Sequence, residues 1–346
     1  MQVISLLLKI VGAVFVFGII IFVHELGHFV CAKLSKIQVN EFALGMGPTL
    51  YKKQIGETVY AIRLFPIGGF VAMEGEDEDS FNPRAFGNRP VSSRILTVAA
   101  GACMNLILGF ALFWILSAGT NLIPTTTVAK FDEAATSSAQ LQVGDTITAI
   151  NGRRIYIASD LSYVMALDSD GLLDITVRRG EESVELYDVP FRTEQDDMGN
   201  QFISRDFWVY GREKTVLGTA RYGFMWTIST ARAVWSSLFD LIGGNLPVSQ
   251  VSGPIGTISV IGEAMSYGLE SILYLLAFLS VNIGMFNILP FPALDGGRLF
   301  FLVIELLTGK QIPQKYEAAI HAAGMILLLM FMLFVTYSDV TRIFTR

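Results

Sequence analysis

The segment that decides the fold runs from Ile4 to His28 and reads ISLLLKIVGAVFVFGIIIFVHELGH. Up to Val23 its only charged residue is Lys9, and roughly 20 apolar residues are enough for a helix to cross a bilayer. The segment lacks the basic start and the small-residue cleavage site of a secretory signal peptide. We therefore expect a retained membrane span that ends in the motif His24-Glu25-Leu26-Gly27-His28.

This motif has the H-E-x-x-H spacing of a zinc site. Residues four apart lie on one face of a helix, so His24 and His28 can hold one Zn²⁺. Glu25 then lies beside the metal, where it can take a proton from water. The alternative is a chance match between core histidines, but the chain has only three histidines, and ionisable residues at the end of a span are usually functional. The sequence predicts a catalytic zinc with Glu25 as the base.

A catalytic zinc needs a third protein ligand, and two residues are candidates. Cys31 follows His28 by three residues and falls on the same helical face. Asp295 lies in the motif LDGG after an apolar run with two prolines, and a buried carboxylate is costly unless it is paired or binds metal. The residues favour Asp295 and leave Cys31 open, because catalytic zinc sites with cysteine exist.

Three further segments are apolar enough to span a membrane, at Ile95 to Gly119, Ile272 to Leu289 and Ala318 to Val335. The chain is 52% hydrophobic and 16% charged, whereas soluble domains carry about a quarter charged residues. Part of the molecule is therefore expected in lipid. The net charge of −6 argues against a nucleic-acid partner, which needs a basic surface.

The segment Val216–Ile242 is helical in pattern but is interrupted by Arg221, Arg232 and Asp240. We expect an amphipathic helix at the membrane interface and not a fifth span. With four spans, the first and third end on the same side, so that Asp295 can meet the histidines. A fifth span would place Asp295 on the opposite face.

Orientation follows from the basic residues near the span ends. The side of the site carries eight: Lys33, Lys36, Arg84, Arg89, Arg94, Arg298, Lys310 and Lys315. The other side carries three: Lys130, Arg342 and Arg346. We expect the site to face the cytoplasm, with the segment between the second and third spans and both termini outside.

Taken together, these features resemble the site-two protease family of intramembrane zinc proteases, in its bacterial branch with an inserted PDZ domain (the RseP type). The residues that carry the resemblance are His24–His28, Gly101, Asn105, Ser252-Gly253-Pro254, Asn282, Asn287, Pro290, Pro292 and Leu294–Gly297. The resemblance implies His24, His28 and Asp295 as ligands of Zn²⁺, Glu25 as catalytic base, and Cys31 as a bystander.

The resemblance also implies a membrane-associated β element between the first two spans, on the cytoplasmic side. Strands are expected at Thr58–Phe65 and Gly69–Met73, with a hairpin closed near Gly68 and Gly69. A transmembrane helix has its backbone groups paired internally, and a free strand edge can capture an unwound substrate segment. The substrate-binding candidates are Gly68, Gly69, Phe70, Val71, Ala72, Asn282 and Asn287, although the two asparagines could instead join neighbouring helices.

A PDZ-like pattern lies between the second and third spans. The stretch Ser138–Asp145, followed by Ile150-Asn151-Gly152, resembles a circularly permuted PDZ domain, with Gln140 where such domains commonly have glycine. Alternating runs at Asp145–Asn151 and Leu173–Arg178 indicate strands. The domain is expected to filter substrates by the size of their external part, with peptide binding as the alternative.

The expected fold is a polytopic α-helical membrane protein with four transmembrane helices, a cytoplasmic-side β element and an inserted extracytoplasmic PDZ domain. The expected parts are an N-terminal membrane region (1–119), the PDZ domain (120–213), the interfacial helix with a connecting segment (214–271) and a C-terminal membrane region (272–346).

The expected function is an intramembrane zinc endopeptidase of the bacterial inner membrane. Its partners would be the lipid bilayer and single-span membrane proteins, such as anti-sigma factors or signal-peptide-like segments, after trimming by an upstream site-one protease. The alternatives are an inactive PDZ adaptor and a membrane zinc carrier. All catalytic positions are present, and the ligands cluster at one face without a polar path across the membrane, so both alternatives are disfavoured.

Overall fold

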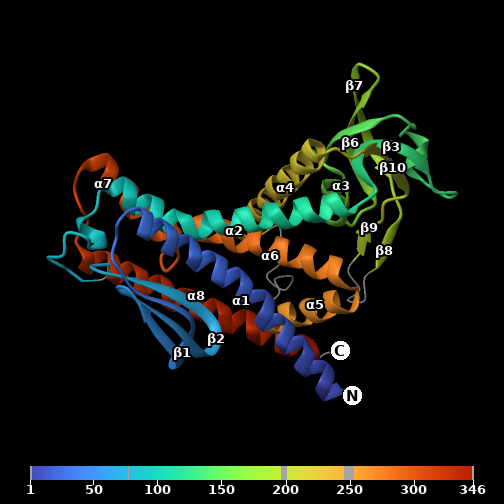
Figure 1. Ribbon diagram of the computed structural model, residues 1–346. Coiled ribbons are helices and arrows are strands. Elements are labelled where there is room, and N and C mark those ends of the chain that lie inside the picture. Colours follow the sequence, from blue (N-terminus) through green and yellow to red (C-terminus); the bar gives the residue numbers. More distant parts are fainter. Residues whose placement is uncertain (1, 77, 196–200, 245–252, 345–346) are drawn as a thin grey trace. The chain divides into compact units, whose positions relative to one another are not determined.

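The computed structural model describes residues 2–76, 78–195, 201–244 and 253–344 (Figure 1). The chain forms two compact units, one of Met1–Leu112 with Thr230–Arg346 and one of Phe113–Ser229. Two helices, α2 (Val91–Gly119) and α4 (Val216–Ile242), run from one unit into the other. Ser252 of the motif noted above lies outside the described residues.

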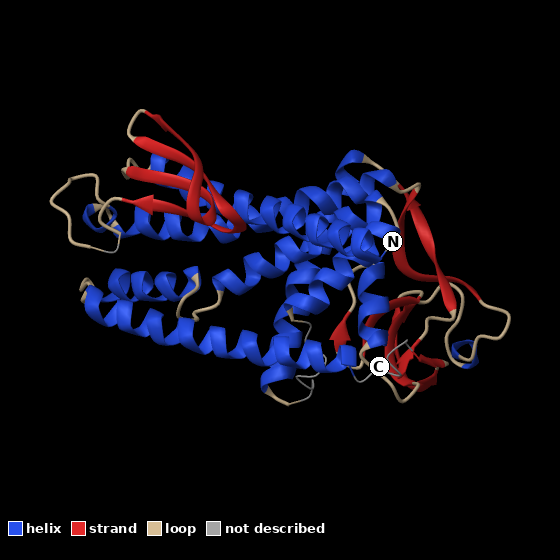
Figure 2. Ribbon diagram, turned by 90° about the horizontal axis from the view of Figure 1, so that it is seen from below, coloured by secondary structure: helices blue, strands red, loops and turns tan. Residues whose placement is uncertain are grey.

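The first unit is mainly helical (Figure 2). Besides the parts of α2 and α4 that belong to it, its elements are α1 (Gln2–Leu34), β1 (Val39–Ile55), β2 (Thr58–Met73), the short 3-10 helix η1 (Phe86–Asn88), α5 (Pro254–Ser266), α6 (Leu269–Ile288), α7 (Asp295–Thr308) and α8 (Gln314–Phe344).

The prediction of four segments apolar enough to span a membrane is confirmed among the described residues. Four helices are long and apolar enough to cross a membrane, at Leu7–Leu34, Val91–Gly119, Leu269–Ile288 and Lys315–Thr341. The helix α4 begins and ends where expected and is not one of the four. Even so, α1 does not end at the H-E-x-x-H motif. It continues to Leu34 and stops where Lys36 adopts a left-handed conformation (φ +56°) and the Ile37 N–H bonds to the Ala32 carbonyl.

The reversal of the chain expected at Gly68 and Gly69 is present, but in the described residues the segments on its two sides do not pair with each other. The strand β2 continues through both glycines, and the hairpin closes at Gly56, where Ile55 pairs with Thr58. The chain reverses beside Gly68, which has a positive φ (+81°), because Gly69–Met73 runs along β1 in the direction opposite to Val59–Ile62. The first part of β1 lies between these two segments, and a turn signal in the sequence does not specify that pairing.

The pairing makes the first part of β1 an inner strand. Phe42 pairs with Tyr60 on one side and with Val71 on the other, and Leu44 likewise pairs with both Ile62 and Gly69. The segment Gly69–Met73 consequently has β1 on one side only, and no described strand pairs with its other side. This segment, called the edge segment below, is a free strand edge.

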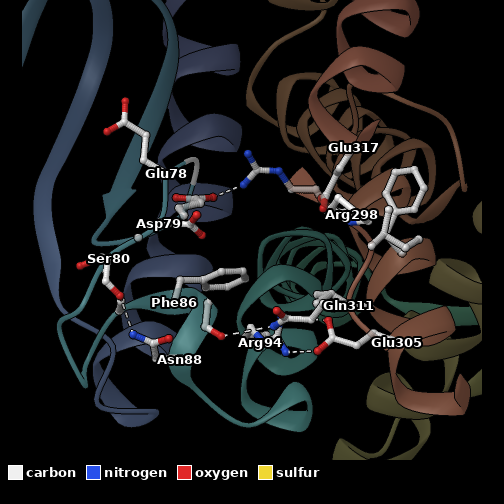
Figure 3. A pocket seen from close by; sticks show the side chains of 18 of the residues that line it. Glu78, Asp79, Ser80, Phe86, Asn88, Arg94, Arg298, Glu305, Gln311 and Glu317 are labelled. Carbon is white, nitrogen blue, oxygen red and sulfur yellow. Dashed lines mark hydrogen bonds and ion pairs between the residues drawn. The ribbon is translucent and has the colours of Figure 1, made fainter. Parts of the chain in front are cut away.

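Ion pairs attach the loops around this sheet to the helices. Glu57, in the β1–β2 turn, binds both Arg84 and Lys33, and hydrogen bonds from these two cations lower the pKa of Glu57 to about 2. Arg94 on α2 and Glu305 on α7 form a buried two-point pair with N–O distances of 3.0 and 2.5 Å (Figure 3). The Glu57 pairs hold two loops against the end of α1, and the Arg94–Glu305 pair joins α2 to α7.

The helix α5 is anchored by a carboxylate from the far end of the chain. Buried Asp339 on α8 accepts hydrogen bonds from the backbone N–H groups of Gly253 (3.2 Å) and Gly256 (2.9 Å). A Cβ on Gly253 would lie 2.6 Å from the Asp339 carboxylate, so only glycine allows this approach. The contact satisfies N–H groups that a helix start leaves unpaired.

The second unit is a β-rich domain. Besides parts of α2 and α4, it contains β3 (Leu122–Phe131), η2 (Ser137–Ala139), β4 (Thr146–Ile150), β5 (Arg153–Arg154), α3 (Ala158–Ala166), β6 (Leu172–Arg179), β7 (Glu182–Pro190), β8 (Thr193–Gln195), β9 (Gln201–Ile203) and β10 (Phe207–Glu213). The main sheet has the order β10-β3-β4-β6-β7, with β5 beside β4. Its core contains Ile147, Leu161 and Ile175. The strands expected near Asp145–Asn151 and Leu173–Arg178 are confirmed as β4 and β6.

Candidate metal centre

Three side chains from opposite ends of the chain meet in the first unit. The Nε2 atoms of His24 and His28 lie 3.2 Å apart, and Asp295 Oδ2 lies 3.1 Å from the first and 3.3 Å from the second. Among the described residues this is the one group of three side chains that could hold a metal ion, with all ligand atoms within 4.8 Å of one another. Cys31 is half-buried and lies outside the group.

Two glycines explain how Asp295 reaches this position. Asp295 is the first residue of α7, and the turn from Leu289 to Leu294 joins it to α6. A Cβ on Gly296 would lie 1.9 Å from the Leu289 carbonyl oxygen, and one on Gly297 would lie 2.6 Å from that of Phe291. The LDGG motif therefore allows the start of α7 to fold back onto the turn.

Three residues of α2, four apart in the sequence, line the histidines. His28 Nδ1 donates a buried hydrogen bond to the Thr97 carbonyl oxygen at 2.9 Å. A Cβ on Gly101 would lie 2.3 Å from His28 Nε2, so the helix passes directly behind both rings. The side-chain amide of Asn105 lies 3.2 Å from His24 Nδ1. Thr97 precedes Gly101 by four residues, as Gly101 precedes Asn105, and this spacing in an apolar helix could have identified Thr97 from the sequence.

The hydrogen bonds around the candidate ligands leave the lone pairs of their coordinating atoms directed at one point. Because the Thr97 carbonyl only accepts, His28 Nδ1 carries the proton and Nε2 is free to coordinate. Asn105 Oδ1 is buried and accepts no hydrogen bond from the described residues. If this amide were rotated by 180°, Oδ1 would accept a hydrogen bond from a protonated His24 Nδ1. His24 Nε2 would then be unprotonated and able to coordinate a metal ion. Asp295 Oδ2 is likewise buried without a hydrogen-bond donor in the described part. Two neutral imidazoles and a carboxylate fit the ligand set of a catalytic zinc.

The edge segment passes beside Glu25. A Cβ on Gly69 would lie 3.0 Å from Glu25 Cγ and 3.2 Å from Ile21 Cγ2. Val71 is buried in the core that joins the sheet to the helices, and the Phe70 ring lies 4.8 Å from the Arg63 guanidinium. The backbone of the edge segment therefore approaches the Glu25 side chain at Gly69.

The two candidate asparagines lie on different faces of α6. Asn282 donates to the Phe278 carbonyl and Asn287 to the Ile283 carbonyl, each four residues earlier in the same helix. Ser280 and Gly284 of α6 contact Asn105 of α2. By helical spacing Asn287 shares that face and Asn282 does not.

A charged pair joins the end of the edge segment to α7. Arg298, three residues after Asp295, forms an ion pair with Glu76, three residues after Met73. Together with the Arg94–Glu305 pair, it lines a cavity of about 860 Å³ beside α7 (Figure 3). The charge pattern of the sequence did not predict either pair, because their partners are 211 and 222 residues apart.

Comparison with known proteins gives consistent matches over almost the whole chain. The family model described as peptidase family M50 matches residues 12–331. A candidate zinc metalloprotease of Clostridium acetobutylicum is 37% identical over 335 residues, covering 96% of this chain and 97% of that protein. A protein of the same description from Nostoc sp. is 31% identical over 359 residues, with 98% of each chain covered. The regulator of sigma-W protease RasP of Bacillus subtilis is 28% identical over 418 residues, covering 97% of this chain and 99% of that protein.

Proposed function

Because the chain belongs to peptidase family M50 and is a zinc metalloprotease, we propose that it cleaves membrane proteins within their transmembrane segments. The observation that carries this proposal is the convergence of His24, His28 and Asp295 in one group, with both histidines and Glu25 on a helix apolar enough to span a membrane. The geometry fits a zinc ion held by those three side chains, with Glu25 free to act on water.

The roles that we propose for the metal and for the residues around it follow from the chemistry of each group. When bound, zinc would polarise the scissile carbonyl and make water more acidic. Glu25 would accept a proton from the attacking water and pass it to the departing amide nitrogen. Asn105 and the Thr97 carbonyl would keep the two imidazoles oriented.

The location of the cut tests this function. The purified protein should cleave a model single-span substrate inside its apolar segment, and mass measurement of the fragments would locate the bond. We expect faster cleavage when glycine or proline near that bond loosens the substrate helix, because unwinding then costs less. Cleavage confined to the soluble flanks would show that the substrate class is wrong.

We also propose that the edge segment presents the substrate. It is a free edge that passes beside Glu25, and a strand added there would bring an extended backbone close to the base. Asn287 shares a helix face with residues packed near Asn105 and is the better placed of the two asparagines to bond exposed substrate backbone.

Proline in the edge segment should reduce cleavage. Successive residues of an edge strand direct their N–H groups to opposite sides, so either Val71 or Ala72 directs its N–H away from β1. Proline at that position removes a donor to the substrate without removing a bond to β1. We expect a loss of about one order of magnitude or more in cleavage rate, consistent with about 1.4 kcal/mol or more in the transition state, while zinc content stays normal.

The control for this test keeps the backbone donor. Val71→Ala and Ala72→Ser change the side chains alone and should cleave at rates close to wild type. If both proline variants fold, bind zinc and cleave at the wild-type rate, substrate does not bind at this edge.

The remaining proposals concern topology and partners. We propose that the metal centre faces the cytoplasm of a bacterial cell and that the second unit lies outside and contains a PDZ-like domain between residues 120 and 213. Its six-stranded sheet and the Asp145–Arg179 ion pair, which fixes the Ser138–Asp145 turn, support a rigid domain of that kind. The similarity to a regulator of sigma-W protease supports substrates such as anti-sigma factors, cut after an upstream protease.

A further inference from the structure

The third histidine of the chain lies next to the turn that carries Asp295. This residue, His321 on α8, is the chain's only histidine outside the H-E-x-x-H motif. Its Nδ1 accepts a hydrogen bond from the backbone N–H of Ala293 at 2.9 Å. Ala293 is two residues before Asp295, so this bond fixes the backbone immediately before the proposed third ligand.

The turn needs such support because its backbone is strained. Ala293 has φ +76°, in the left-handed region that residues other than glycine rarely adopt. A conformation of this kind persists only where the surrounding structure holds it. The Ala293 N–H points to the His321 ring, so the bond stabilises the strained conformation directly.

The helix α8 holds the turn at a second point on the same face. Gly324 is three residues after His321, and a Cβ there would lie 2.4 Å from Pro292 Cβ and 2.7 Å from the Pro292 carbonyl oxygen. On the α7 side, the His321 ring contacts Phe301, with ring centroids 5.8 Å apart. The imidazole is therefore packed between the turn and α7, with little freedom to rotate.

The hydrogen bond also determines the form of the ring. Because the Ala293 N–H is a donor, His321 Nδ1 must be the acceptor, and in the neutral ring the proton is on Nε2. Nε2 lies 3.9 Å from a carboxylate oxygen of Glu317, one helical turn earlier. Glu317 therefore stands on the side of the ring that carries the proton.

We propose that His321 is a positioning residue for the metal centre: by accepting the Ala293 N–H, it fixes the turn that presents Asp295 to His24 and His28. This inference rests on the proposed zinc site and adds the fourth apolar helix to it. His321 is not a member of the group of candidate ligands, and we propose that it acts through the backbone of the turn.

The test compares two substitutions of similar size in the full-length protein in detergent. In His321→Asn, the side-chain Oδ1 occupies the place of Nδ1 and can still accept the Ala293 N–H. In His321→Leu, a methyl group takes that place and no acceptor remains. Zinc affinity is measured by competition with a chelator, and the absorption spectrum of the Co²⁺-substituted protein reports the coordination geometry.

We expect His321→Leu to lower zinc affinity by about 10- to 100-fold, the range found when a residue supporting a metal ligand is lost, and to alter the Co²⁺ spectrum. His321→Asn should retain affinity close to wild type. Asp339→Ala is the matched control, because it removes a different anchor of α8, the one to α5, and should leave affinity unchanged in the folded protein.

Any of three results would overturn the proposal. The first is that His321→Leu binds zinc as tightly as wild type and has the same Co²⁺ spectrum. The second is that His321→Asn loses as much zinc affinity as His321→Leu, and the third is that Asp339→Ala does so. The variant Asp295→Ala distinguishes an error in the role of His321 from an error in the proposed zinc ligands. If it binds zinc as well as wild type does, the proposed ligand set is wrong; if it alone loses affinity, only the role of His321 is wrong.

Discussion

Replacing Glu25 with glutamine is expected to abolish cleavage while zinc remains bound. Glutamine has nearly the same shape as glutamate, but it cannot accept a proton from water at neutral pH. Glu25 is outside the group formed by His24, His28 and Asp295, so the metal should be retained. Loss of a general base typically costs about 10²- to 10⁴-fold in rate, which should leave no detectable fragments from a model substrate in a timed assay.

The measurement combines fragment analysis with metal analysis on the same purified samples. Glu270→Gln, an exposed carboxylate at the start of α6, is the matched control and should cleave at the wild-type rate. Wild-type turnover by Glu25→Gln would exclude the proposed base. A wild-type protein that binds zinc without any turnover would instead support an adaptor or a zinc carrier.

The parts of this molecule that could be predicted from sequence depend on local patterns. The four spans follow from runs of apolar residues, and the pair His24 and His28 follows from a spacing of four on a helix. Asp295 was predicted from a different kind of argument. With four spans, only one span separates the first from the third, so both end on the same side and a carboxylate at the end of the third could reach the histidines.

The parts that could not be predicted depend on contacts between distant segments. Asn105 is 81 residues from His24, and Ala293 is 28 residues from His321. Whether two helices place such groups in contact depends on their rotation and relative height, which hydropathy does not specify. The segments before and after Gly68 and Gly69 also do not pair with each other as a hairpin would, because both pair with the first part of β1, and a turn signal does not specify the pairing partner.

The supports of the site also explain its arrangement. The two histidines come from one helix and need no loop to align them, so α2 only has to orient their rings. Asp295 directly follows a turn, and turns are more variable than helices. Two glycines pack α7 against this turn, His321 of α8 accepts a hydrogen bond from it, and Arg298 ties α7 to Glu76. The proposed third ligand is therefore the part of the candidate centre most dependent on the rest of the fold.

Replacing Asp295 with alanine should accordingly remove zinc and stop turnover, whereas Cys31→Ser should change neither. Asp295 supplies the one carboxylate among the three converging groups, and two histidines alone leave a catalytic zinc one ligand short. Zinc affinity should fall by more than the roughly 10- to 100-fold expected for a supporting residue. Metal analysis after dialysis against a chelator, together with the cleavage assay, measures both effects.

The comparison with Cys31 decides between the two ligands that the sequence allowed. Cys31 lies three residues after His28 on the same helix, yet its sulfur is outside the group that surrounds Asp295 Oδ2. Serine keeps the size of cysteine and removes the thiolate, so only a coordinating sulfur would be missed. Zinc lost from Cys31→Ser and retained in Asp295→Ala would reverse the assignment, and with it the argument that the LDGG turn exists to deliver a carboxylate to the histidines.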